Sequence, residues 1–446
     1  MKRSTLVKQS LAVCIGLLLA KGAVAETLQN ALFKTLHTNP SILASEKDSC
    51  AITQALQGAK GGYLPTLDAT AGYGVQHTES PFVLGDADSP STQLAQTTLV
   101  RRETGLAADQ MLFDGFATSS EVARNKARLN AADYKVLGTA QDVGLNAAQA
   151  YLNVLKEQQL IREAQNNVST HSQVGGLLEK RQESGLDQTA DLTQAQGRVS
   201  LAKANLTAEK ANLIDAESNY LQVVGETPYN LSMPSLQRIA RFMPRSENQA
   251  VRMAIANHPI LKSARADMDA TYAQHEAALS KNYPRFDLQV NANRNDNIDG
   301  VKGQDNQEQA MVRMNYNLYH GGADKARQNE TAYLYQESAE VMHKTYRQVV
   351  NNAQLSWNAW QSAKAQLPML KAHRDDALKS FNAYQQQFTL SKRSLLDLLD
   401  AQNEYYQSNR AYTEGQYNAI YAEFRVLNSI GSLIQAEHIN FRTQTV

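Results

Sequence analysis

Apolar and polar residues alternate along four short stretches of this chain. The clearest stretch is RFDLQVNANRN, in which Phe286, Leu288, Val290 and Ala292 alternate with polar neighbours. The same alternation occurs at residues 312–318 and 67–75, and more weakly at 98–113. Successive side chains of a strand point to opposite faces, so the pattern predicts four half-apolar strands. Turn-rich loops separate the members of each pair, and we therefore expect β-hairpins at about 66–113 and about 285–319.

The stretches after each hairpin have helical periodicity instead. From Ala323 to about Phe388 the sequence contains no convincing helix stop except Pro368. This run predicts a nearly continuous helix of about 65 residues, or about 100 Å at a rise of about 1.5 Å per residue. Pro368 cannot donate a hydrogen bond to the carbonyl of Lys364, so we expect a local kink there.

A second, shorter helix follows each long one across a turn. In the first half its apolar positions are spaced alternately by three and four residues: Leu192, Ala195, Val199, Ala202, Leu206, Leu213, Ala216 and Tyr220. Glu209 breaks this pattern. Such spacing predicts a coiled-coil seam, and its many small residues predict close approach of the helices.

The two halves of the chain repeat each other. An offset of 206 positions aligns several pairs: Gly115 with Gly321, Tyr151 with Trp357, Asp191 with Asp397, and Gly225 with Gly431. Upstream, an offset of 219 aligns Asn39-Pro40 with His258-Pro259. Chance matches scatter in offset, so a duplication is the better explanation. We expect repeats at 26–232 and 233–446, with long helices at about 117–224 and about 323–431.

Strands of about ten residues with one apolar face are typical of transmembrane barrels. The alternative is a soluble amphipathic hairpin packed on a core. Four strands cannot close into a barrel, and open edges are not tolerated in lipid, so several chains would have to share one barrel. Two chains would supply eight strands and three would supply twelve, and the residues alone do not choose between them.

The N-terminus has the features of a secretory signal peptide. A basic start precedes an apolar run of about ten residues and a small-x-small site at Ala23-Val24-Ala25. We expect a signal peptide at 1–25; a signal anchor is the minor alternative, because the run is too short to span a membrane. Later hydrophobic runs are interrupted by charge, which excludes a helical membrane protein.

The charge balance and the cysteine content narrow the classes of protein to which this chain could belong. Loss of Lys2, Arg3, Lys8 and Lys21 with the signal leaves 40 basic residues against 44 acidic ones. Such a balance gives no indication of nucleic-acid binding. Cys50 is alone in the mature chain and cannot form an internal disulfide, so stability must come from packing or assembly.

No catalytic chemistry is visible in the sequence. GAKGGY at Gly58 lacks the Gly-Lys-Ser/Thr ending of a phosphate loop. No two of the nine histidines stand four positions apart, as the paired histidine ligands of a helical metal site with a carboxylate partner would. There is neither a metal-ligand cluster nor a nucleophile elbow. We therefore expect a protein that is not an enzyme and that has no metal and no cofactor.

One leucine-rich stretch carries unexpected charge. In SLLDLLDAQNEYY, Asp397 and Asp400 stand three residues apart among leucines, and such charges must be solvated, paired or functional. Two solvated surface carboxylates are the simplest explanation. The repeat partner TADLTQAQ keeps Asp191 but has Gln194 in place of the second acid, so the doubled acid belongs to only one of two equivalent hairpins. This asymmetry favours a function for the aspartates while the leucines pack the hairpin.

The combination resembles the TolC-type outer-membrane efflux and type I secretion channels. The resemblance rests on the duplicated halves, the Asn39-Pro40 and His258-Pro259 openings, FDG at 113–115, YHGG at 319–322 and LLDLLDAQ. It implies a mainly α protein with transmembrane β: a homotrimer in which each chain gives four strands to one twelve-stranded barrel, continued by a coiled-coil helical tunnel through the periplasm.

The same resemblance implies a location and a task. The protein is expected in the outer membrane of a Gram-negative bacterium, in contact with its lipid, as a passive, gated export duct. Its partners would be a periplasmic adaptor and an inner-membrane pump of ABC, RND or MFS type, whose cargo is drugs or proteins. The pump would supply the energy.

The resemblance also implies a constriction and a latch. Asp397 and Asp400 match the acids that ring the periplasmic entrance, and such a ring favours cations. Family members hold the entrance shut with a tyrosine and an arginine bonded to a Thr-Asp pair. Arg393 and Asp191 match the arginine and the acid, so their salt bridge is the expected latch. Phe388 occupies the tyrosine position, and Ala190 occupies the threonine position.

The adaptor would dock at the hairpin tips, around Gly185-Leu186 and Ser391-Lys392. Two rival classes are weaker. A surface-exposed structural or adhesive coiled-coil protein would not account for the four alternating strands. A periplasmic adaptor would need a lipoyl-like β domain and only one helical hairpin.

Overall fold

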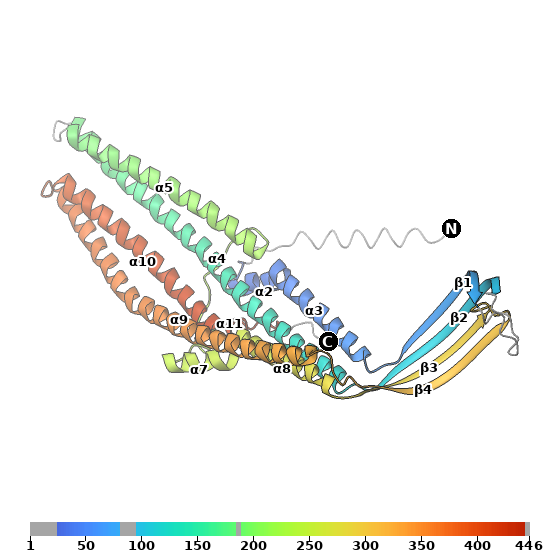
Figure 1. Ribbon diagram of the computed structural model, residues 1–446. Coiled ribbons are helices and arrows are strands. Elements are labelled where there is room, and N and C mark those ends of the chain that lie inside the picture. The colour runs from blue at the N-terminus through green and yellow to red at the C-terminus, as the bar shows by residue number, and fades with distance from the viewer. Residues whose placement is uncertain (1–24, 81–94, 184–188, 442–446) are drawn as a thin grey trace, which may run out of the picture. The chain divides into compact units, whose positions relative to one another are not determined.

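The computed structural model describes residues 25–80, 95–183 and 189–441, and Figure 1 labels their elements. All but the last residue of the predicted signal peptide lie outside this part. The chain divides into two compact units. Among the described residues, 25–47, 134–261 and 345–441 form the first, here called the helical unit. Residues 48–133 and 262–344 form the second, here called the sheet unit.

The sheet unit contains one antiparallel sheet of four strands in the order β1-β2-β3-β4. The strands are β1 (Thr66–Ser80), β2 (Ala95–Phe113), β3 (Arg285–Asp296) and β4 (Gln304–Asn315). They form the two predicted hairpins, and β2 also pairs with β3, so the two repeats share one sheet (Figure 1).

Strand β4 ends before the predicted hairpin end at 319. Its last residue, Asn315, pairs with Arg285, the first residue of β3. Pro284 precedes Arg285 and has no N–H to extend the ladder. Asn317 instead donates a side-chain hydrogen bond to Asp324, at 2.7 Å, in the following helix. The alternation at Tyr316 and Leu318 therefore continues past the point where the partner strand begins.

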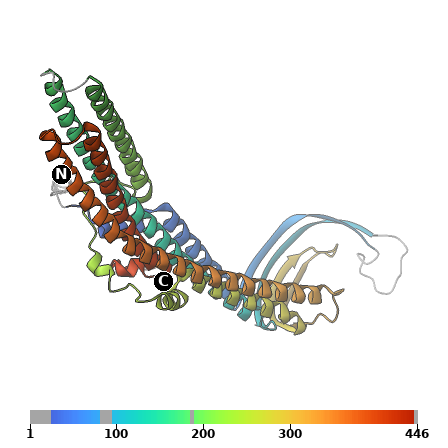
Figure 2. The same ribbon diagram turned by 90° about the vertical axis from the view of Figure 1, so that its left-hand side faces the viewer.

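Two helices are as long as the sequence predicts. α4 (Ala117–Glu183) and α9 (Ala323–Thr389) each contain 67 residues, and their bounds differ by the offset of 206. α5 (Thr189–Val224) and α10 (Leu395–Ser429) follow them in the chain. Within the helical unit, α4 and α5 form one hairpin, here called the outer hairpin, and α9 and α10 form another, here called the inner hairpin. The end of α4 and the start of α5 lie at the same end as the turn between α9 and α10 (Figures 1 and 2).

Shorter helices repeat at the second offset. α2 (Leu28–Thr38) and α3 (Pro40–Gly61) correspond at 219 positions to α7 (Glu247–Asn257) and α8 (Pro259–Leu279). Pro40 and Pro259 each begin a helix, where a missing N–H costs nothing. The remaining helices are short: α6 (Leu236–Ile239), η1 (Ser280–Asn282) and α11 (Leu433–Ala436). Among the described helices, none combines the length and apolar character that crossing a membrane requires.

The predicted seam is buried in both repeats. Ala195, Ala202 and Tyr220 of α5 are buried, as are their α10 counterparts Ala401, Ser408 and Val426. Glu209, which breaks the spacing, is also buried and forms an ion pair with Arg410 of α10. A buried carboxylate is tolerated there because a charged partner from the other hairpin reaches it.

Candidate functional site

The turn of the inner hairpin is closed by backbone hydrogen bonds. Lys392 N–H donates to the Gln387 carbonyl at 2.9 Å, and Ser391 N–H donates to the Phe388 carbonyl at 2.9 Å. This pair of bonds is the Schellman arrangement that ends a helix. Its central residue, Ser391, has the left-handed φ of 56° that this arrangement needs. The predicted docking residues Ser391 and Lys392 are thus exposed on an ordered turn.

The connection between α4 and α5 lies outside the described residues. It contains the predicted docking residues Gly185 and Leu186. Their docking role, like that of Ser391 and Lys392, stays a prediction.

Asp397 lies in the first turn of α10. The Ser394 hydroxyl caps this helix by accepting from Asp397 N–H at 3.2 Å. Asp191 occupies the same place in the first turn of α5. Acidic side chains are favourable at a helix N-terminus because the unpaired N–H groups there carry partial positive charge. An acid at position 397 is therefore explained in part by its favourable interaction with the N-terminus of α10.

Asp400 needs a different explanation, because it lies beyond the first turn. Its side chain is 62% exposed, and its Oδ1 lies 3.4 Å from an Nη atom of Arg198 on α5. The leucines at 395, 398 and 399 are buried, as predicted, whereas Leu396 is 51% exposed. Asp397 and Asp400 thus lie away from the buried leucine side of α10, and Asp400 is tied to the outer hairpin.

Arg393 contacts residues of its own hairpin. Its Nε donates to the Gln387 side chain at 3.0 Å, and its guanidinium lies 4.1 Å from the centre of the Tyr384 ring. Its ion pair, at 3.8 Å, is with Asp397. In the described part of a single chain the Arg393 guanidinium therefore pairs with Asp397, and the latch to Asp191 stays a prediction.

Phe388 is buried in a core that all four long helices share. It is 7% exposed, and the Arg181 guanidinium of α4 lies 5.3 Å from its ring centre. This hydrophobic cluster comprises Val174, Leu178, Ala195, Phe381, Phe388, Leu395, Leu398, Leu399 and Ala401. An aromatic ring at 388 therefore holds the two hairpins together by packing, without the hydroxyl group of a tyrosine.

The residue at this site that sequence reasoning missed is Arg198. Its partner, Asp400, lies more than two hundred positions away, and no local spacing points to it. The duplication offers one clue. At the offset of 206, Arg198 of α5 corresponds to Glu404 of α10, and Glu404 stands four positions after Asp400, on the same face of that helix.

His171 of α4 is buried and lies close to the guanidinium of Arg198. Burial first, and the charge of Arg198 second, lower the pKa of His171 to about 4.

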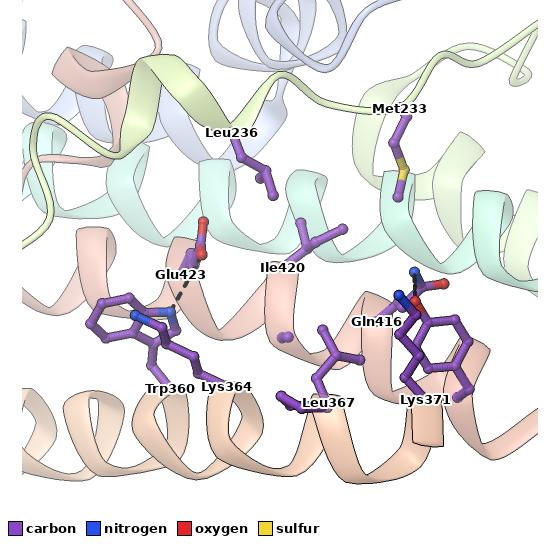
Figure 3. Close-up of a pocket in the computed structure, with 12 residues that line it drawn as sticks. Met233, Leu236, Trp360, Lys364, Leu367, Lys371, Gln416, Ile420 and Glu423 are labelled. Carbon is purple, nitrogen blue, oxygen red and sulfur yellow. Dashed lines mark hydrogen bonds between the residues drawn. The ribbon is translucent and has the colours of Figure 1, made fainter. Parts of the chain in front are cut away.

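Pro368 lies inside α9, which continues through it to Thr389. It lines a pocket of about 530 Å³ between α9, α10 and the segment at Met233 and Leu236, where Trp360 Nε1 donates to Glu423 at 3.4 Å (Figure 3). Burial raises the pKa of the Glu423 carboxyl, and the bond from Trp360 partly offsets this effect. The structure places Pro368 beside a mainly apolar hollow, and the predicted kink stays a prediction.

Within the described residues, no cluster of three or more His, Cys, Asp or Glu side chains could hold a metal ion. The tips instead present carboxylates balanced by arginines from both hairpins. This arrangement can select ions by charge and can hold two hairpins together or release them.

A small antiparallel sheet joined to two very long helical hairpins, duplicated within one chain, defines the class of outer-membrane channels that extend into the periplasm. The model of the family described as outer membrane efflux protein matches residues 32–226 and 250–432, and the chain belongs to this family. The predicted family, its location in the Gram-negative outer membrane and its role as an export channel are thereby confirmed.

Individual relatives cover nearly the whole chain. Outer membrane efflux protein BepC of Brucella suis is 26% identical over 93% of this chain and 88% of its own length. Outer membrane protein TolC of Vibrio cholerae is 22% identical and covers 94% of each chain. The crystal structure of a membrane protein from Pseudomonas aeruginosa superimposes with a TM-score of 0.79 at 16% identity, over 91% of this chain and 90% of that one.

Proposed function

We propose that three copies of this chain form one passive, gated export duct, with a shared twelve-stranded barrel and a helical tunnel. The observation that carries this proposal is the sheet, whose described edge strands are β1 and β4. Edge strands expose unpaired N–H and C=O groups, which lipid cannot satisfy. Joining β4 of one copy to β1 of the next removes every edge.

Side-chain exposure supports the same assembly. Leu67, Tyr73 and Val75 of β1 are more than two-thirds exposed in the single chain, and Val312 and Met314 of β4 are more than half exposed. Such an apolar band is stable when it faces lipid. The strands contain 12 to 19 residues, which exceeds the nine to eleven or so that span a bilayer.

The duct would take its cargo from partners. A periplasmic adaptor would dock at the turns around Gly185-Leu186 and Ser391-Lys392, and an inner-membrane pump would supply the energy. The cargo of such a pump would be small drugs or secreted proteins. The chain itself would contribute a path and a gate, with no catalytic step.

The gate would be the ring of acids at the inner tips. Three copies bring six carboxylates together from Asp397 and Asp400; in the single chain Arg198 pairs with Asp400 and Arg393 with Asp397. If Arg393 turned from Asp397 to Asp191, the ring would carry excess negative charge, which attracts cations and repels anions. The ion pair of Asp400 with Arg198, together with the predicted pairing of Arg393 with Asp191, would hold the hairpins in the closed position.

The test is ion selectivity in planar lipid bilayers. Asp397→Ala combined with Asp400→Ala is expected to reduce the preference for cations and to abolish block by polyvalent cations. A matched control, Asp375→Ala with Asp376→Ala, removes the same charge from α9 and is expected to retain both properties. Equal behaviour of the two double variants would refute the assigned constriction. A heat-modifiable trimer in outer-membrane fractions tests the assembly separately, and a monomer would refute it.

A further inference from the structure

A second polar site lies in the helical unit, between α4, α9 and α10. It is a pocket of about 70 Å³ lined by Glu163, Asn166, Asn167 and Thr170 of α4, Phe381 of α9, and Gln402, Tyr405, Tyr406 and Asn409 of α10. A single water or ion needs only about 10–15 Å³ of such space. The pocket is therefore large enough for a small ion with part of its hydration shell.

Two residues that line this pocket, Glu163 and Gln402, each have a buried oxygen atom without a hydrogen-bond partner in the described structure. Glu163 is 7% exposed; its Oε1 accepts from the Thr413 hydroxyl at 2.6 Å and from Gln159 at 3.1 Å, but its Oε2 has no partner. Gln402 is 2% exposed, and its Oε1 also has no partner. An unsatisfied buried acceptor destabilises the fold, and a charged one does so more strongly.

The charges of two arginines, Arg162 and Arg410, act on Glu163, but neither forms an ion pair with it among the described residues. Arg410 is already shared between Glu209 and Glu414. Arg162 is exposed and donates to Gln159. Burial raises the pKa of the Glu163 carboxyl, and the hydrogen bonds from Thr413 and Gln159 and the charges of Arg162 and Arg410 only partly offset this effect. The site thus combines one buried carboxyl group with acceptor oxygens from side-chain amides.

This donor set has a specific chemical preference. Carboxylate and amide oxygens are ligands for hard cations. Divalent and transition ions usually have several acidic, histidine or cysteine ligands, and no described cluster of three such residues exists here. A single carboxylate matches a single positive charge.

We propose that this pocket binds one monovalent alkali cation, sodium or potassium, between Glu163 Oε2 and Gln402 Oε1. The ion neutralises the buried carboxylate and satisfies both orphan oxygens. Because Glu163 belongs to the outer hairpin and Gln402 to the inner one, the ion ties the two hairpins together. This tie is distinct from the tip residues and does not depend on their proposed role in the gate.

The first test measures the thermal stability of the purified, full-length protein in detergent. Sodium or potassium chloride is expected to raise the melting temperature saturably over choline chloride of equal ionic strength. Glu163→Gln is expected to melt at the same temperature in all three salts. Glu157→Gln is the matched control, since Glu157 is also buried on α4 with an orphan Oε2 but lies outside the pocket.

Equal stabilisation of the wild type by choline, or an unchanged salt response in Glu163→Gln, overturns the proposal. A second measurement needs no variant. Crystals of the wild type grown in rubidium chloride are expected to show an anomalous peak between Glu163 and Gln402. Density without anomalous signal at that position means a water molecule and overturns the proposal equally.

Discussion

Ser391 holds the turn of the inner hairpin in a conformation that suits glycine better than serine. A residue with a Cβ pays about 1 kcal/mol or more for the left-handed region. Glycine removes this strain but adds freedom to the unfolded chain. We therefore predict that Ser391→Gly raises the free energy of unfolding by about 0.5–1 kcal/mol.

Hydrogen exchange of the amides at 389–392, together with the melting temperature, measures this effect. Ser391→Ala is the control, because it keeps the strain while removing the hydroxyl that lies 3.5 Å from Arg181. It is expected to be neutral or slightly destabilising. Stabilisation by alanine as large as that by glycine would show that the backbone conformation is not the cause.

His171 makes stability depend on pH in a defined direction. Its pKa is about 4 in the folded chain against an ordinary value of 6.5, because burial and Arg198 disfavour the charged ring. Between these values the unfolded chain binds a proton that the folded chain does not, so stability falls as pH is lowered through the window from 6.5 to 4. The loss attributable to this side chain approaches about 3 kcal/mol below pH 4.

The measurement is the difference in melting temperature between the wild type and His171→Gln across this window. Glu163 acts in the opposite direction, because its raised pKa favours proton uptake by the folded chain. Glu163 is present in both proteins, so its contribution cancels when the melting temperature of His171→Gln is subtracted from that of the wild type. The wild type is expected to lose its stability relative to the variant as pH falls. The same change at the exposed His373 is the control and should leave the pH dependence as it is.

At the scale of elements, the start of each very long helix offers a matched pair of glycines. Gly115 has a φ of 68°, and a Cβ there would lie 2.5 Å from the Ser280 carbonyl oxygen and 2.8 Å from Tyr283 Cβ. Gly321 has a φ of 58°, and a Cβ there would meet nothing within 4 Å. Both positions require a left-handed backbone conformation, but only at Gly115 do neighbouring atoms occupy the space that a Cβ would need.

We predict that Gly321→Ala costs about 1 kcal/mol from backbone strain, and that Gly115→Ala costs about 1–3 kcal/mol more from overpacking. Chemical denaturation of the two variants side by side measures the difference. Equal costs would mean that the close approach of Ser280 and Tyr283 to Gly115 is relieved without strain.

At the scale of the whole channel, two arginines hold the hairpins by different contacts. Arg198 links α5 to Asp400 of α10, whereas Arg393 contacts Tyr384, Gln387 and Asp397 of its own hairpin. If the tips form the gate, Arg198→Ser releases an outer-to-inner tie and unmasks Asp400. We predict higher conductance and stronger cation preference for this variant.

Arg393→Ser is also expected to raise conductance, since it removes the predicted latch partner of Asp191. Single-channel recording of both variants and of their combination tests these predictions. Arg162→Ser removes an equal charge from an exposed position on α4 and serves as the control, with conductance expected to match the wild type. No change in either tip variant would mean that the shared hydrophobic cluster around Phe388 closes the tips alone.

The hydrophobic pattern by itself determined the helices, the seam and the duplication. The side-chain period of a helix or a strand is a local property, so α4 and α9, the seam at Ala195 and Ala202, and the alternating strands could all be read from neighbouring residues. The constant offset of 206 then related the two hairpins without any knowledge of their contacts.

Only the tertiary structure decided which charged groups meet. Arg198 and Asp400, Arg410 and Glu209, and Thr413 and Glu163 are each about two hundred residues or more apart, and the packing of the outer hairpin on the inner one brings them together. No period in the sequence encodes such distances. The burial of Glu209 and of Glu163 likewise depends on what another helix places over them, because the exposure of a side chain is a property of the packed surface.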